Sequence, residues 1–279
     1  MSMRSIMMGL QTVLGLRRRG FFIPYRYADT LPAGGDVATY QPILEDLKGC
    51  EESFARIIQS IDIYADDLLA IGDEAAPQPR WQQDWFPRLD AATAYALVRE
   101  TKPRRIVETG SGHSTRFMAR AVRDGNGTTA ITAIDPAPRA AIDNLGVEVI
   151  RKTVAQAGVG PFADLAAGDI IFIDSSHIMM PGSDVDDLLN RILPTLPAGV
   201  LVHIHDIFLP DDYPSAWAWR GYNEQSAVLP LLSGGGYEIV FSSYYAVSRM
   251  GDKVQASVLG KLPLPEGAYE TSLWLRKIK

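Results

Sequence analysis

Residues 105–115 constrain the fold of this chain more than any other stretch. The apolar run Arg105–Thr109 predicts a strand, Gly110 and Gly112 predict a tight turn, and residues 114–122 predict a helix. A side chain in such a turn would obstruct the bend and keep a ligand away from the backbone, which explains the glycines. Strand, glycine turn and helix form the opening unit of a doubly wound α/β domain, whose ligand lies over that turn.

The chain from residue 91 onward continues this alternation, which predicts an α/β fold with a mostly parallel sheet. Asp90 is expected to cap a helix over residues 91–101, and further helices are expected at 138–144, 184–193 and 226–232. The six further strands expected are Ala130–Ile134, 147–150, 169–173, 199–205, Tyr237–Ser242 and 272–278.

Residues 1–88 are interpreted as a helical N-terminal extension or cap, and residues 89–279 as the α/β domain. Apolar residues recur at helical spacing over residues 40–71, which predicts one long helix or two helices with a break near Gly49.

Composition narrows the range of partners. The net charge of -6 argues against nucleic acid, because phosphate binding needs a basic surface. No apolar run approaches the roughly 20 residues that span a bilayer. The single cysteine, Cys50, fits a reducing compartment, and we expect a cytoplasmic protein.

Residues 5–16 are mostly apolar and precede Arg17-Arg18-Arg19, an order opposite to that of a secretory signal. They predict either a docking helix or a peripheral membrane contact.

Acidic residues and histidines gather where the predicted strands end. Glu108, Asp135, Asp174 and Asp206 end, or directly follow, the first, second, fourth and fifth strands. The four histidines, His113, His177, His203 and His205, fall at or near the same edge. Ligands of open parallel sheets bind beyond the carboxyl ends of the strands, so this edge is the expected site. His203 lies within a strand and is expected to be buried and structural.

The glycine turn separates two cofactor classes. A dinucleotide fold expects a third glycine or alanine where this chain has Thr115, and the acid Glu108 suits a cationic ligand better than a polyphosphate. Glu108-x-Gly110-x-Gly112-x-Ser114 resembles motif I of the class I methyltransferases that use S-adenosylmethionine (SAM). The resemblance implies a Rossmann-like sheet with the strand order 3-2-1-4-5-7-6. It also implies SAM binding by Glu108, Gly110, Ser111, Gly112, Ser114, Asp135 and Asp174.

Two further motifs, Ile173-Asp174-x-Ser176-His177 and His205-Asp206-Ile207, narrow the resemblance. With motif I they resemble the branch that contains macrolide-sugar O-methyltransferases and cephalosporin hydroxylase-like proteins. That branch implies His177 as general base and a divalent metal, Mg²⁺ or another, at Asp174, His205 and Asp206. His205 departs from the oxygen ligand usual there, which leaves the metal open.

The expected activity is O-methylation (EC 2.1.1.-) of a hydroxyl on a sugar or glycosylated small molecule. An NAD-dependent oxidoreductase and a non-catalytic SAM-fold ligand-binding protein remain as alternatives, and a homo-oligomer is a further option.

Overall fold

The structure is a computed structural model that describes residues 3–32, 35–72 and 74–279. Two compact units make up the chain, one of Met1–Ala38 with Asp212–Gly221 and the other of Thr39–Asp211 with Tyr222–Lys279. The first unit contains α1 (Met3–Val13) and the 3-10 turns η1 (Ala28–Thr30) and η5 (Ser215–Arg220). Its two segments are joined by a hydrogen bond of 3.2 Å from the Gly35 amide to the Asp212 carboxylate.

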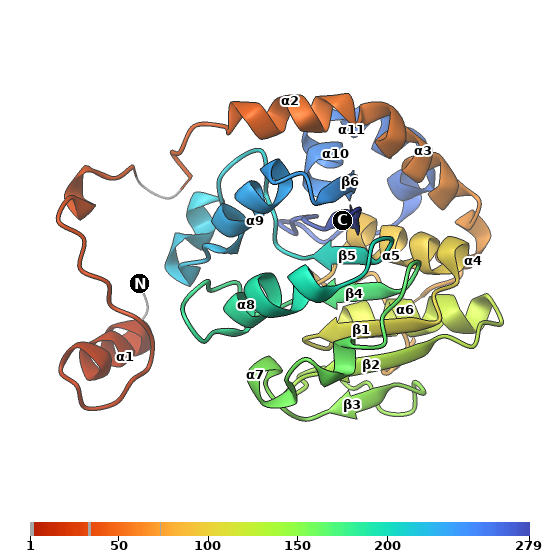
Figure 1. Cartoon of the computed structure of the whole chain (residues 1–279). Helices are drawn as coiled ribbons and strands as arrows, with labels where there is room; N and C mark the ends of the chain where they lie inside the picture. Colours follow the sequence, from red (N-terminus) through yellow and green to blue (C-terminus); the bar gives the residue numbers. More distant parts are fainter. Residues whose placement is uncertain (1–2, 33–34, 73) are drawn as a thin grey trace. The chain divides into compact units, whose positions relative to one another are not determined.

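The second unit is built on a seven-stranded sheet with the order β3-β2-β1-β4-β5-β7-β6, as the resemblance implied (Figure 1). The first five strands pair in parallel, and β7 pairs antiparallel with both β5 and β6. The central strands are buried along almost their whole length, so they are continuous apolar runs rather than alternating ones. The strands are β1 (Arg105–Thr109), β2 (Ala130–Ile134), β3 (Glu148–Ile150), β4 (Ile170–Ile173), β5 (Leu201–Ile204), β6 (Tyr237–Ser242) and β7 (Leu273–Lys277).

Helices cover both faces of this sheet. The chain passes from β1 to β2 in one direction along the sheet and from β4 to β5 in the other. Because such crossovers are right-handed, the connecting helices lie on opposite faces, with α8 in front and α6 behind in Figure 1. The helices are α2 (Gln41–Gly49), α3 (Glu51–Asp62), α4 (Ala65–Leu69), α5 (Arg88–Thr101), α6 (His113–Asp124), α7 (Val154–Ala157), α8 (Asp184–Asp187), α9 (Glu224–Ser233), α10 (Ser243–Arg249) and α11 (Gly251–Ala256).

Shorter turns complete the second unit. Helix α8 continues as a π-helix, Leu188–Ile192, and a 3-10 turn, Leu193–Thr195. Further 3-10 turns lie at Gly160–Phe162 and Val258–Lys261.

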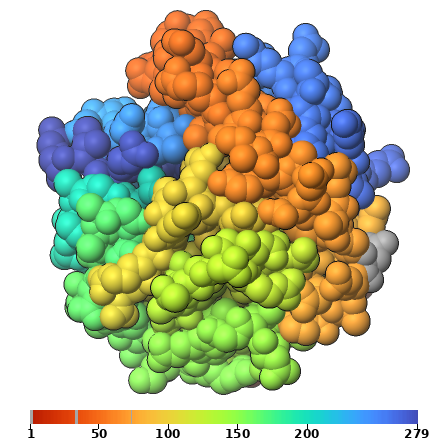
Figure 2. All heavy atoms as spheres, turned by 90° about the vertical axis from the view of Figure 1, so that its right-hand side faces the viewer, coloured from red at the N-terminus to blue at the C-terminus, as the bar shows by residue number. Residues whose placement is uncertain are grey.

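The break predicted near Gly49 is present, because α2 ends at Gly49 and α3 begins at Glu51. A second break, which was not predicted, separates α3 from α4 at residues 63–64. Phe54 of α3 is fully buried and packs edge-on against Phe241 and Tyr245. Helix α3 also lies beside α5, as the orange and yellow atoms of Figure 2 show. The compact unit therefore reaches back to Thr39 by packing, while the domain boundary near residue 88 stays a prediction.

Two expectations about helices were wrong. Residues 138–144 form no helix, and Asn144, the last of them, has a φ of 66°, outside the helical region. Asp90 does not cap α5, whose N-cap is Pro87. Glu270 accepts the amide of Leu89 at 2.6 Å in the first turn, which leaves the Asp90 carboxylate free for a different contact.

No helix among the described residues is long and apolar enough to span a membrane.

Candidate active site

The expected site lies where the strand order reverses. Strands β1 and β4 are neighbours whose following connections run in opposite directions, which opens a crevice at their carboxyl ends. The register aligns Thr109 with Ile173, and Ile173 with Ile204. Asp174 and His205, the next residue of each strand, therefore stand side by side at this edge.

The glycine turn after β1 passes close to the end of β4. Gly110 has a φ of 79°, and a Cβ there would lie 2.1 Å from the carbonyl oxygen of Asp174. No other residue fits this position. Gly112 differs, because its backbone is extended and a Cβ on it would meet nothing within 4 Å. The open space above Gly112 is where a bound molecule could approach the backbone.

Glu108 is fully buried below this turn. Its carboxylate accepts hydrogen bonds from the hydroxyls of Ser114 and Thr115, which tie β1 to the first turn of α6. Burial raises the pKa of Glu108 to about 8, although the two hydroxyl bonds act in the opposite direction. The structure thus turns Glu108 and Ser114 toward each other, and their contact with a cofactor stays a prediction.

Asp135 follows β2 and holds the other side of the turn. One carboxylate oxygen accepts from the Ser111 amide at 2.9 Å and from its hydroxyl at 2.7 Å. The other accepts from the Ala137 amide at 2.8 Å. The predicted pair of Ser111 and Asp135 is therefore brought together, with Asp135 half-buried at the sheet edge.

His113, the first residue of α6, carries a buried Nδ1 atom without a hydrogen-bond partner among the described residues. Burial, together with the positive charges of Arg116 and Arg80, lowers the pKa of His113 to about 4. The ring is therefore neutral at pH 7. A buried polar atom without a partner calls for an explanation, and a ligand over the glycine turn could supply one. Sequence reasoning placed His113 near the edge without giving it a role.

Four predicted residues form a ring of alternating acids and imidazoles beyond β4 and β5. His177 Nε2 lies 3.4 Å from Asp174 Oδ1 and 3.4 Å from Asp206 Oδ2. His205 Nδ1 lies 3.6 Å from Asp174 Oδ1 and 3.6 Å from Asp206 Oδ1. The side chain of Asp174 is the most open of the four, with 35% exposed, whereas both imidazoles are at most 5% exposed. We call this set the acid–imidazole ring.

Two further carboxylates, absent from the predicted site, support this ring from behind. Glu224 at the start of α9 is fully buried, and its Oε2 lies 2.9 Å from His177 Nδ1. Asp90 of α5 is also fully buried; it accepts the amides of Thr271 and Ser272 at 2.9 Å and lies 3.4 Å from His205 Nε2. Each imidazole thus has a carboxylate at both nitrogens.

These contacts set the charges in the ring. Burial by itself would lower the pKa of His177, but Asp174, Glu224 and Asp206 overcome it and raise the pKa well above the usual value. His205 behaves in the same way, through Asp206, Asp174 and Asp90. Burial would raise the pKa of Asp174, yet the imidazoles of His205 and His177 hold it well below its usual range. The ring therefore favours imidazolium and carboxylate.

The backbone of the ring is strained in two places. His177 and Asp206 have φ angles of 59° and 56°, in the left-handed region that residues with a side chain adopt rarely. The first is held in place because its carbonyl accepts the amides of Asn223 and Glu224 at 3.1 and 3.3 Å. Such strain gathers at functional sites, where the surrounding structure maintains it.

His203 lies apart from this chemistry, as expected. It is fully buried, stacks on Phe172 with ring centroids 3.6 Å apart, and bonds the Ser272 hydroxyl at 2.8 Å.

The donors of the ring suit a divalent cation in type and charge. Four carboxylates face two imidazoles, so negative charge remains in excess even when both rings are protonated. Metal-bound histidines commonly place their second nitrogen against a carboxylate, as both do here. In the part of the chain that the structure describes, however, no group of three or more His, Cys, Asp and Glu side chains could hold a metal ion as it stands.

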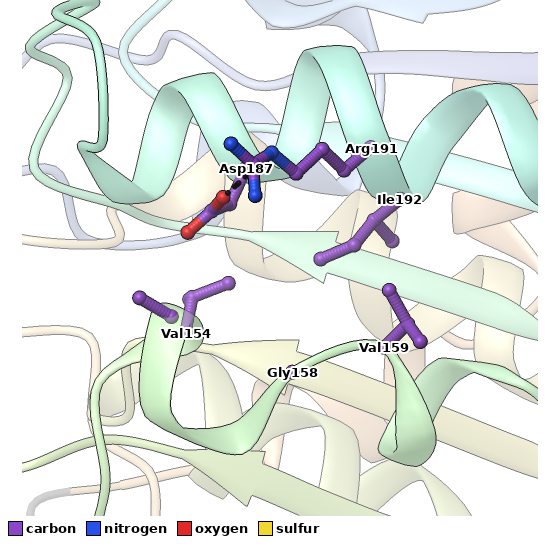
Figure 3. A pocket seen from close by; sticks show the side chains of 7 residues that line it. Val154, Gly158, Val159, Asp187, Arg191 and Ile192 are labelled. Atoms are coloured by element: carbon purple, nitrogen blue, oxygen red, sulfur yellow. Dashed lines mark ion pairs between the residues drawn. The ribbon is translucent and has the colours of Figure 1, made fainter.

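A shallow pocket lies between α7 and the π-helix that follows α8 (Figure 3). Its volume is about 110 Å³, and Val154, Val159 and Ile192 give it apolar walls. Arg191 and Asp187 form an ion pair of 3.3 Å at its edge. None of the predicted site residues lines this pocket.

Residues 107–207 match a family model described as a methyltransferase domain. The match runs from β1 through β5 and includes the glycine turn and the acid–imidazole ring. The match over residues 107–207 confirms the resemblance to the class I methyltransferases, and an oxidoreductase is not favoured. A comparison with curated proteins finds no match.

Solved structures resemble the chain distantly. The methyltransferase PaMTH1 of Podospora anserina, bound to S-adenosylhomocysteine (SAH), is 16% identical to this chain. The two structures match with a TM-score of 0.42 over 93% of this chain and 100% of that one. The plantazolicin methyltransferase BpumL, in complex with SAH, is 16% identical, with a TM-score of 0.43 over 85% and 100%. The methyltransferase MycE of the mycinamycin pathway, in complex with Mg and SAH, is 17% identical, with a TM-score of 0.38 over 66% and 48%.

Proposed function

We propose that this chain is a SAM-dependent O-methyltransferase (EC 2.1.1.-) that acts on a hydroxyl of a sugar or glycosylated small molecule. The observation that carries the proposal is the position of the acid–imidazole ring directly beside the glycine turn, at the switch point of the sheet. A cofactor over the turn and an acceptor over the ring would then be neighbours. A reducing cytoplasm, inferred from Cys50, and a homo-oligomer remain predictions.

The space above Gly112 and the unpartnered His113 Nδ1 support a cofactor over the turn. Asp135 is the proposed ribose ligand, although Ser111 already donates twice to one of its oxygens. An ionised carboxylate has about four acceptor sites, so Asp135 retains capacity for a hydroxyl. SAM, when bound, supplies an electrophilic methyl group and leaves as a neutral thioether.

His177 is the proposed general base. Its Nδ1 faces Glu224, which favours the tautomer that leaves Nε2 free to accept a proton. As the acceptor oxygen forms its bond to the methyl carbon, the carbon–sulfur bond breaks and the hydroxyl proton passes to His177 Nε2. Because the neighbouring carboxylates favour the imidazolium, His177 has to reach its neutral form before it can accept the proton.

Asp174, His205 and Asp206 are the proposed ligands of a divalent metal, which would supply Lewis acidity to the acceptor hydroxyl. The imidazole among them favours zinc, iron or manganese over magnesium. Activity that withstands a strong chelator and does not respond to added metal would contradict this part of the proposal.

Methyl transfer from SAM labelled in its methyl group, measured across a panel of sugars and glycosides, tests the function. We expect label in at least one hydroxyl acceptor. Replacing His177 by alanine should slow transfer by roughly 10²–10⁴-fold, the usual contribution of a general base, and leave the affinity for S-adenosylhomocysteine (SAH) unchanged. Unaltered turnover would remove His177 from the base role. Binding of SAH without transfer to any acceptor would favour the non-catalytic alternative.

A further inference from the structure

Exposed apolar side chains concentrate in the first unit of the chain. Of the 21 large apolar side chains that are exposed among the described residues, 13 lie between Met3 and Leu31. Trp219, which is 70% exposed, adds another from the second segment of the same unit. The remaining exposed apolar residues are scattered over the second unit. Such a concentration of exposed apolar side chains on one short segment indicates a binding surface.

Helix α1 arranges part of this surface as one face. Met3, Ile6, Met7, Leu10 and Val13 recur at spacings of three and four residues, so they lie along one side of the helix. None of the residues of α1 is buried. The apolar face therefore has no partner among the described residues of its own unit.

The charge of the same segment is strongly one-sided. Residues 1–28 contain five arginines and no acidic residue, and Asp29 and Asp36 are the only acids up to residue 38, although the whole chain has a net charge of -6. Three of these arginines, at positions 17–19, directly follow the apolar residues 5–16. The positive charge therefore lies next to the apolar face rather than elsewhere on the protein.

Aromatic side chains accompany the arginines. Phe22 is 67% exposed, and the Arg18 guanidinium lies 4.9 Å from the ring of Phe21. Arg220 lies 5.3 Å from the ring of Trp219. Exposed Trp, Tyr and Phe beside Arg are typical of segments that lie in the interface between lipid headgroups and acyl chains.

We propose that the unit formed by residues 1–38 and 212–221 binds the surface of an anionic lipid membrane. The apolar face of α1 and the exposed aromatic residues would enter the headgroup region, and the arginines would contact the acidic headgroups. The absence of acidic residues from positions 1–28 favours an anionic surface over an uncharged one. This inference does not depend on the methyltransferase activity.

Sedimentation of the full chain with vesicles tests the proposal. We expect binding to vesicles of phosphatidylcholine mixed with phosphatidylglycerol and much weaker binding to phosphatidylcholine alone. Replacing the arginines at 17–19 by glutamine should weaken binding on the order of 100-fold, because each contributes about a factor of five at an anionic surface. Leu10→Ser should weaken it as well, through the apolar face.

A matched variant, with Lys48, Arg56 and Lys253 replaced by glutamine, changes the net charge equally. These residues are exposed in the second unit, and their replacement should leave vesicle binding intact. The proposal is overturned if the wild-type chain does not bind the mixed vesicles, or if the matched variant loses as much binding as the 17–19 variant. It is also overturned if sedimentation velocity shows a dimer that Leu10→Ser dissociates, because a second copy would then cover this face.

Discussion

Replacing Glu224 by leucine or by glutamine tests how the site positions its base. Glu224 is fully buried and lies 2.9 Å from His177 Nδ1. Hydrogen bonds to charged groups contribute about 1.5–3 kcal/mol, and those between neutral groups about 0.5–1.5 kcal/mol. Glu224→Leu removes the whole interaction and should lower kcat by roughly 10–150-fold. Glu224→Gln keeps an acceptor oxygen and loses only the charge, so the expected decrease is about 5–15-fold.

Initial rates at saturating SAM and acceptor measure this effect, together with the KM of each substrate and the affinity for SAH. A control variant, Glu238→Gln, makes the same chemical change at a half-exposed carboxylate of β6 and should leave kcat unchanged. Wild-type kcat in Glu224→Leu would refute the positioning role. A loss of SAH affinity equal to the loss of kcat would show instead that the substitution disturbs the cofactor turn.

Two further predictions concern the glycine turn. Gly112→Ala should leave the melting temperature nearly unchanged, because a Cβ there meets nothing within 4 Å of the protein. The same Cβ should weaken SAH binding through a clash of about 1–3 kcal/mol, and equal affinity would place the ligand elsewhere. Glu108 has a folded-state pKa of about 8 against an ordinary value of 4.5, so the stability that it contributes is full below about pH 4.5 and is lost as the pH rises through 8. Melting temperatures at about pH 5 and about pH 9 should therefore differ more for the wild type than for Glu108→Gln, and an identical pH dependence would contradict the raised pKa.

The apolar pattern of the chain was sufficient for the sheet but not for every helix. The expected strands at Arg105–Thr109, Ala130–Ile134 and Tyr237–Ser242 match the observed bounds. The buried parts of these strands are runs of apolar residues, and a short window of sequence is enough to detect such a run. The segment at 138–144 has a composition that suits a helix, yet it forms none and ends in Asn144 with a φ of 66°.

The site could be predicted where strand register brings residues together, and not where distant helices contribute. Asp174 and His205 stand side by side because their strands pair. Glu224 and Asp90 lie 47 and 115 residues from the histidines that they contact. Each is an acid in the first turn of a helix, a position that the helix dipole favours without any function. Glu108 bonds the hydroxyls of Ser114 and Thr115 in α6, contacts that the motif did not predict, and its contact with a ligand stays a prediction.

Calorimetric titration of the full chain with SAH, beside NAD and with or without a divalent metal, tests the central claim most directly. We predict micromolar binding of SAH and none of NAD, because the glycine turn carries an open Gly112 and no third glycine. Binding of NAD alone would contradict the assignment of the cofactor and return the oxidoreductase to consideration.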